Sequence, residues 1–197
     1  LLPEKDIDQI ELFCACHVNN ETGQKHNLSE LRKLFSNRCI FCIDAAQSLG
    51  KAFLPWKFAK IDLMALSARK IGAPPSVGAL IVRKRVKLQP QILGGGQQNN
   101  LRSGTLNPAA IAAFADCVEL VCNEQEENMK KNWLLNRILR EKIPEISAGK
   151  WQILSDEFSV SDILLLSIPG CEGAVLARML AEEANIILSP GSACAAE

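Results

Sequence analysis

One stretch of the chain places a reactive side chain directly after a short apolar run. Residues 63–66 are predicted to form a buried strand, and Ser67, Arg69 and Lys70 follow it before Gly72 interrupts regular structure. Ligands of α/β proteins bind at the carboxyl ends of parallel strands, so a lysine at this position is a candidate for forming a Schiff base. A loop lysine that caps the strand is the alternative, and the lysine alone does not exclude it.

A second apolar run ends in a carboxylate. Residues 39–43 are predicted to form a strand buried on both faces, and Asp44 and Gln47 follow it. Asp44 is either the N-cap of the next turn or a carboxylate directed at a ligand, and its position alone does not separate the two. Because the carboxyl ends of parallel strands share one edge of a sheet, we expect these groups to lie near Lys70 and near Asn19 or Asn20, which follow an earlier strand.

One of the eight cysteines has little to pack against. Cys194 lies in the small-residue run 191–196, whereas several others fall inside apolar runs, where a free cysteine behaves as a small hydrophobe. Cys194 is therefore the candidate reactive thiol. The first residues contain neither a signal-peptide core nor an initiator methionine, so we expect a natural start before Leu1 and a reducing, cytoplasmic location.

Some of the other cysteines have a spacing that could bind zinc. Cys14, Cys16 and His17 precede the pair Cys39 and Cys42, which is a possible ligand set. If 39–43 is a strand, however, a separation of three residues sends the last two side chains to opposite faces. We therefore expect no metal site.

Composition gives no reason to expect a nucleic acid or a membrane as a partner. The 197 residues contain 22 basic and 22 acidic side chains, with a pI near 6.9. No apolar run reaches the ~20 residues that a membrane-spanning helix needs.

The remaining elements follow from apolar spacing and from helix and turn signals. Strand, helix, strand and crossover in the first half predict an α/β fold. Asn27 is predicted to cap a helix of about ten residues, and any break in the long helix that Pro144 ends is expected between Asn123 and Asn128. The other predicted elements are strands at 9–16, 77–82 (possibly antiparallel), 151–154 and 162–168, and helices at 107–143 and 172–183.

Six short motifs occur along almost the whole chain. They are His-Val-Asn-Asn-Glu-Thr-Gly at 17–23, Asp-Ala-Ala-Gln-Ser at 44–48, Ser-Ala-Arg-Lys at 67–70, Gly-Gly-Gly-Gln at 94–97, Arg-Ser-Gly-Thr at 102–105 and Gly-Ser-Ala-Cys at 191–194. In order and spacing they resemble the cysteine desulfurase and selenocysteine lyase family (NifS-like), pyridoxal 5'-phosphate (PLP) enzymes of the class V aminotransferase group. Each motif alone is a weak signal, whereas six in register are a strong one.

The resemblance implies a three-layer PLP-dependent transferase large domain with a mainly parallel sheet, followed by part of a smaller α+β domain. It divides the chain into 1–106, part of the PLP-binding domain, 107–145, a long connecting helix, and 146–197, part of the small domain with the cysteine loop. The family's N- and C-terminal portions, with its ring-stacking histidine and its substrate-binding arginine, are expected to be absent.

The resemblance also implies roles for single residues in the PLP site. Lys70 would form the Schiff base with PLP and move protons at the substrate's α-carbon. Asp44 would keep the pyridine nitrogen protonated. Gln47 and Asn20 would lie at the ring's phenolic oxygen, and Ser67 would bind the phosphate.

Two further residues are implied to act in catalysis and assembly. Thr105 would reach the phosphate of a neighbouring subunit's PLP, which predicts a homodimer. Cys194 would attack the sulfur of substrate L-cysteine, release L-alanine and hold a persulfide for an acceptor protein.

The chain departs from the family at Arg69, where a histidine usually precedes the lysine. A guanidinium can also bind phosphate through several donors, so we assign Arg69 to the phosphate. The resemblance thus favours a PLP-dependent cysteine desulfurase that supplies sulfur for iron–sulfur clusters or other thio-cofactors. The alternatives are another class V PLP enzyme, such as a selenocysteine lyase, or a catalytically degenerate relative that serves as a binding partner.

Overall fold

The computed structural model describes residues 4–191, which fall into two compact units. The sheet unit consists of Leu1–His17 and His26–Gln125, and the second unit consists of Val18–Lys25 and Glu126–Glu197.

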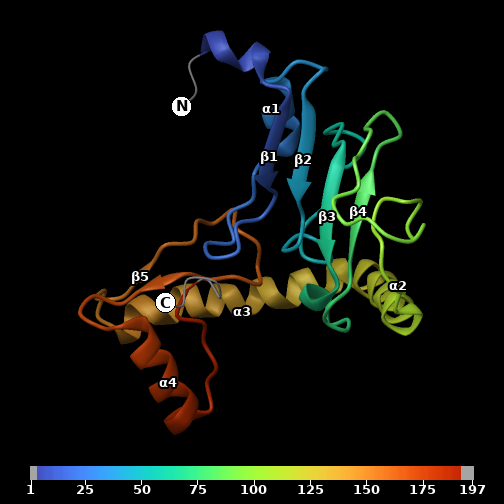
Figure 1. The fold of residues 1–197 in the computed structure, drawn as a ribbon. Helices are drawn as coiled ribbons and strands as arrows, with labels where there is room; N and C mark the ends of the chain where they lie inside the picture. Colours follow the sequence, from blue (N-terminus) through green and yellow to red (C-terminus); the bar gives the residue numbers. More distant parts are fainter. Residues whose placement is uncertain (1–3, 192–197) are drawn as a thin grey trace. The chain divides into compact units, whose positions relative to one another are not determined.

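The sheet unit contains a four-stranded sheet in the order β1-β2-β3-β4 (Figure 1). The strands are β1 (Leu12–Cys16), β2 (Ile40–Asp44), β3 (Leu63–Ser67) and β4 (Gly78–Val82). Neighbours among β1, β2 and β3 are parallel, whereas β4 runs antiparallel to β3, as its short connection suggested. The prediction of an α/β fold with a mixed, mainly parallel sheet is therefore confirmed.

Strand β1 is shorter than predicted. It begins at Leu12 and not at residue 9, because the 3-10 helix η1 (Glu4–Gln9) precedes it. The backbone N–H of Ile10 bonds to the carbonyl of Ile7 and closes that turn.

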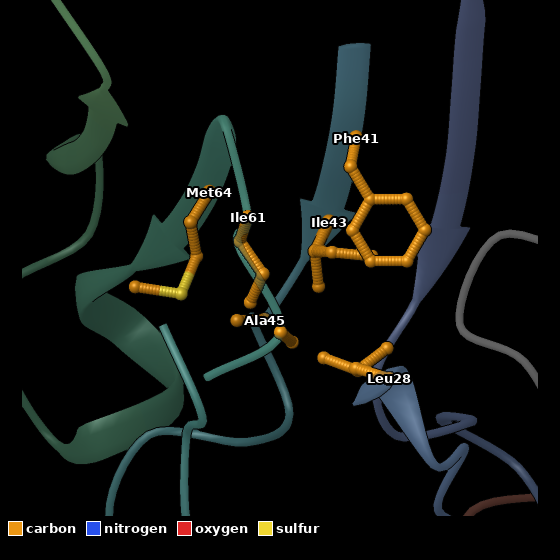
Figure 2. Close-up of a cluster of buried hydrophobic side chains, with 7 residues drawn as sticks. Leu28, Phe41, Ile43, Ala45, Ile61 and Met64 are labelled. Carbon is orange, nitrogen blue, oxygen red and sulfur yellow. The ribbon is translucent and has the colours of Figure 1, made fainter. Parts of the chain in front are cut away.

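The main apolar core lies on one face of this sheet. Phe41 and Ile43 of β2 are fully buried, and they pack with Leu28, Ile61 and Met64 (Figure 2). The side chains of β2 alternate between this core and the opposite face, as the period of two in a strand requires.

Helix α1 (Leu28–Lys33) contributes Leu28 to the core. Its N-cap is Asn27, as predicted, whose side-chain oxygen accepts the N–H of Glu30 at 3.2 Å. The helix has six residues and not about ten. Buried Arg32 explains the early end, because its guanidinium donates to the carbonyl of Ser36 at 2.7 Å and so holds the chain that leads back to β2.

A buried ion pair joins the start of β3 to the segment after β4. Asp62 is 1% exposed, and its Oδ2 lies 2.6 Å from Nη2 of Arg85. The same oxygen accepts the backbone N–H of Phe41 at 3.0 Å. Burial by itself raises the pKa of Asp62, but the bonds from Arg85 and from Phe41 outweigh it and lower that pKa below its usual value.

The long helical region is two helices. Helix α2 (Pro108–Asn123) lies in the sheet unit, and α3 (Gln125–Ile146) follows after Glu124, inside the range where a break was expected. Helix α2 packs Phe114 against Leu49, Ala68 and Ala73 in a second buried cluster. Pro144 does not end α3, which continues to Ile146. A proline in the last turn removes only one intrahelical N–H, so the helix tolerates it there.

The second unit contains little regular sheet. Strands β5 (Gln152–Ile153) and β6 (Leu166–Ser167) pair antiparallel over two residues each, which is shorter than predicted. Helix α4 (Gly173–Ala184) agrees with the predicted helix to within one residue at each end. Along residues 4–191, no helix is long and apolar enough to cross a membrane.

Candidate active site

The carboxyl ends of β2 and β3 lie side by side. Asp44, the last residue of β2, is in register with Ala65 of β3, and the N–H of Ala45 donates to the carbonyl of Ala65 at 2.9 Å. On the other side of β2, the N–H of His17 donates to the carbonyl of Asp44 at 2.9 Å. Three neighbouring strands therefore end at one edge of the sheet, where α/β proteins bind ligands.

Asp44 caps the turn that follows it and still offers a second oxygen. Its Oδ1 accepts the N–H of Ala46 at 2.8 Å. One carboxylate oxygen therefore caps the turn, as one of the two sequence-based alternatives predicted. The side chain is exposed, and within residues 4–191 its Oδ2 has no hydrogen-bond partner. The carboxylate can therefore hold the turn and bind a ligand cation at the same time.

Gln47 lies in the turns that continue from Asp44. Its Oε1 accepts a hydrogen bond from Nζ of Lys51 at 2.9 Å, and both side chains are half-buried. The turn is closed by the N–H of Ser48, which donates to the carbonyl of Ala45 at 2.9 Å. The amide nitrogen of Gln47 is thus left to donate elsewhere.

The cationic part of the site follows β3. Ser67 ends the strand, and Arg69 and Lys70 lie in the single-turn 3-10 helix η2 (Ala68–Ile71). Buried Ala68 anchors this turn in the core while the side chains of Arg69 and Lys70 are exposed. Gly72 ends the turn at φ +83°, a left-handed conformation that glycine adopts without strain.

The side chains of Ser67, Arg69 and Lys70 make no hydrogen bond to other residues of the range 4–191. In the part of the chain that the structure describes, Arg69 and Lys70 form no ion pair, and the hydroxyl of Ser67 makes no capping bond to η2. A strand-end lysine that serves only as a cap would bond to backbone carbonyls, and Lys70 bonds to none among the described residues. That observation weighs against the capping alternative.

No contact among the described residues connects two further predicted site residues, Asn20 and Thr105, with this group. Asn20 is exposed and lies in the segment Val18–Lys25, which is part of the second unit. In that segment, the carbonyl of Gly23 accepts the backbone N–H of Val160 at 2.8 Å. Thr105 is exposed in the loop before α2. Cys194 lies outside the described residues.

The loop before Thr105 is held by its own side chains. The buried Ser103 donates its hydroxyl to the carbonyl of Gly95 at 2.9 Å, and the N–H of Gly104 donates to Oε1 of Gln97 at 3.3 Å. A side chain on Gly94 would meet Cβ of Ser103 at 3.0 Å. The glycine run therefore lets the loop close on itself around Ser103.

A pair of thiols lies just before Asp44 on the same face of the sheet. Cys42 of β2 is in register with Cys14 of β1. Burial, together with Cys14 and Asp44 nearby, raises the pKa of Cys42 to about 11. The Cys42 thiol is therefore neutral at physiological pH and adds no charge beside Asp44. The described residues contain no group of three side chains that could hold a metal ion.

The groups at the strand ends match the functional groups of PLP. A free carboxylate oxygen suits a protonated ring nitrogen, and an amide donor suits a phenolic oxygen. A hydroxyl and an arginine suit a phosphate, and an unpaired lysine suits an aldehyde. On the chemistry of this donor set, the sheet unit fits the cofactor.

A model of the family described as aminotransferase class-V matches residues 3–197. The chain belongs to this family. Its members are PLP-dependent enzymes, so the match and the donor set at the strand ends agree.

Curated relatives narrow the comparison to cysteine desulfurases. The chain is 36% identical over 185 residues to a mitochondrial cysteine desulfurase of Candida albicans, which covers 90% of the chain and 36% of the relative. It is also 36% identical over 201 residues to cysteine desulfurase IscS of Buchnera aphidicola, covering 98% of the chain and 48% of the relative. The chain thus spans less than half of each of these relatives.

Solved structures show the same fold. A NifS-like protein matches with a TM-score of 0.88 and 28% identity, over 94% of this chain and 51% of that one. A NifS-like protein from Rickettsia africae matches with a TM-score of 0.86 and 28% identity, over 92% and 50%. This class V family member therefore has the fold of about half of a NifS-like protein.

Sequence reasoning did not predict the contact between Lys51 and Gln47. Nothing in the local pattern of Lys51 marks a functional lysine, since it follows Gly50 in a turn. The only available signal was its spacing of four residues from Gln47, which is too common to single it out.

Proposed function

We propose that this protein is a PLP-dependent cysteine desulfurase, which converts L-cysteine to L-alanine and transfers the sulfur to Cys194 as a persulfide. Support comes from the names of its relatives and from its membership of a PLP-dependent family. One observation carries the proposal. Asp44 is the last residue of β2, and Lys70 lies in the turn that follows the neighbouring parallel strand β3; both keep polar atoms that have no partner among the described residues.

Each cofactor contact is assigned to a group of this chain. Asp44 would hold the ring nitrogen protonated through its free oxygen, and Gln47 would donate its amide to the phenolic oxygen. Ser67 and Arg69 would bind the phosphate. Asn20 is assigned to the phenolic oxygen by the family resemblance alone.

Lys70 carries two tasks in this assignment. Its amine would bind the cofactor's aldehyde, and after substrate exchange the freed amine would move a proton at the substrate's α-carbon. When bound, PLP supplies an electron sink for bonds broken next to the substrate nitrogen.

The sulfur step belongs to Cys194. Its thiolate would form an S–S bond with the sulfur of substrate cysteine while the carbon–sulfur bond breaks. The electron pair of that bond stays on the carbon skeleton, which takes up a proton and leaves as L-alanine. The persulfide would then pass to an acceptor protein for iron–sulfur cluster or other thio-cofactor assembly.

Assembly and compartment follow the same proposal. Thr105 would reach the phosphate in a neighbouring subunit, so the active form would be a homodimer. All seven cysteines that the structure describes are free, which suits a reducing compartment such as the cytoplasm.

Sulfide and alanine release by the full-length protein, supplied with PLP, L-cysteine and a thiol reductant, tests the proposal. Equal amounts of both products are expected. The variant Cys194→Ser should retain PLP and lose sulfide release. The variant Lys70→Ala should lose both its bound PLP and its sulfide release.

The other outcomes identify the alternatives. Undiminished sulfide release by Cys194→Ser would overturn the assignment and favour another class V activity, and release from selenocysteine alone would indicate a selenocysteine lyase. A full-length protein that takes up no PLP would indicate a degenerate relative acting as a binding partner.

A separate variant tests Arg69. We expect Arg69→Ala to weaken PLP binding and Arg69→His to retain most of it, because arginine and histidine side chains can both donate to phosphate. If Arg69→Ala binds PLP as tightly as the wild type, the phosphate role of Arg69 is wrong.

A further inference from the structure

A charged side chain, that of Lys51, contacts Gln47, and neither the motifs nor the comparisons assign it a role in the site. Nζ of Lys51 lies 2.9 Å from Oε1 of Gln47. Lys51 is half-buried, so this contact lies partly out of solvent, where a charge-assisted hydrogen bond is stronger than at the surface.

The bond selects one orientation of the amide. A carboxamide has an acceptor end and a donor end of nearly equal size, and a turn by half a revolution about its last bond exchanges them. A lysine ammonium has only donors. It therefore fixes the oxygen of Gln47 toward itself and leaves the NH2 group directed elsewhere.

The backbone that carries both residues is held in place. The N–H of Lys51 donates to the carbonyl of Ser48 at 3.0 Å, and the N–H of Ala52 donates to the same carbonyl at 2.8 Å. Gly50, which directly precedes Lys51 and has φ +75°, lies very close to α2. A Cβ added to Gly50 would be 2.9 Å from Cβ of Val121. The close approach of Gly50 to α2 and the two bonds to Ser48 thus restrict the backbone that carries Lys51.

We infer that Lys51 is a positioning residue of the cofactor site, which fixes the carboxamide of Gln47 so that its NH2 group donates to an anionic oxygen of the ligand. This inference rests on the proposed function, because the phenolic oxygen of PLP is the acceptor in question. The inference adds Lys51 to the site and explains its role. Without Lys51, the amide of Gln47 can turn its oxygen toward the ligand, where the anionic oxygen would repel it.

PLP binding to the full-length protein tests the inference through a double-mutant cycle. Lys51→Met keeps the length and the apolar stem of the side chain but removes its donors. It should raise the PLP dissociation constant about three- to tenfold in the wild-type background, the range expected for one hydrogen bond. In the Gln47→Ala background the same change should have no effect, because Lys51 acts through Gln47.

Two further variants control for structure. Lys51→Arg retains donors and should stay within about twofold of the wild type. Lys57→Met changes an exposed lysine six positions along the chain and should leave the dissociation constant unchanged. If Gln47→Ala binds PLP too weakly to measure, the difference between Lys51→Met and Lys51→Arg decides the question.

The outcomes separate this inference from the proposed function. If PLP binds but Lys51→Met has no effect, or the same effect in both backgrounds, Lys51 does not act through Gln47 and only the inference fails. If the wild type binds no PLP, the proposed function fails and the inference fails with it.

Discussion

The two units of the molecule are stabilised in different ways. The sheet unit has an apolar core, in which Phe41, Ile43 and Ile61 are all 0% exposed. In the second unit, buried Asn136 donates to the carbonyl of Ser161 at 3.0 Å and accepts from Arg140 at 2.7 Å. Helix α4 there contains no buried residue.

This difference shows where each kind of function can be built. Apolar packing places the strand ends of the sheet unit rigidly, which suits groups that must bind a cofactor in one orientation. A unit held by hydrogen bonds has fewer apolar contacts to lose and opens locally at a smaller free-energy cost. In the proposed function, the cysteine loop would have to approach both a substrate and an acceptor, and by sequence it follows α4 of this second unit.

The largest expected effect comes from the apolar core. Phe41→Ala should destabilise the sheet unit by about 4 kcal/mol, since it removes a fully buried aromatic ring. Native-state hydrogen exchange of the β2 amides measures the free energy of opening. Phe58→Ala removes the same ring at a site that is 79% exposed and should change the free energy of opening by less than about 0.5 kcal/mol. Equal effects would mean that Phe41 does not belong to a cooperative core.

The buried ion pair should rank second. Asp62→Asn should cost about 2 kcal/mol, less than for a fully buried pair because Arg85 is half-exposed. Hydrogen exchange of the β2 amides measures this cost, because the backbone N–H of Phe41 donates to Asp62. No change would show that the pair adds nothing beyond packing.

The effect of Asp62 should depend on pH with a definite sign. Since its pKa is lowered on folding, its contribution is fully present above the unfolded-state value of about 4 and is lost as pH falls through the lowered folded-state value. The gap between wild type and Asp62→Asn should therefore shrink below about pH 4. A gap that widens on acidification would contradict the lowered pKa.

In the second unit, Asn136→Ala should cost about 1.5 kcal/mol, because it leaves the carbonyl of Ser161 and the Nε of Arg140 without their partner. Exchange of the α3 amides should rise while that of β2 stays unchanged. Asn132→Ala is the matched control, since its bond to Asp162 is exposed and should contribute less than about 0.5 kcal/mol. Faster exchange in β2 would show that the two units unfold together.

The smallest effect is expected in α4. Met179→Ala removes a side chain that is 46% exposed on a helix with no buried residue, so the cost should be below about 0.5 kcal/mol. A cost above about 2 kcal/mol would mean that Met179 is buried in an apolar core. The two units would then be stabilised in more similar ways than described above.

The sequence predicted the sheet unit better than the second unit, for a physical reason. Buried strands are marked by uninterrupted apolar runs, and Asn27 caps its helix through a local bond, so both are readable from neighbouring residues. The early end of α1 depends on Arg32 reaching Ser36 and Cys39, which no local pattern reveals.

The same limit applies to the second unit and to the site. Strands β5 and β6 are short because the polar network, and not strand pairing, holds the chain around them. Among the site residues, the strand-end positions of Asp44 and Lys70 follow from sequence. The contact between Lys51 and Gln47 does not, because a bond across a turn depends on how the turn packs against α2.

Borohydride reduction of the full-length protein loaded with PLP, followed by peptide mass spectrometry, tests the central claim most directly. The account predicts one pyridoxyl group, attached to Lys70, and none on the peptide carrying Lys51. A pyridoxyl group on a different lysine, or no modification at all, would contradict the assignment of the strand ends of the sheet unit as a PLP site.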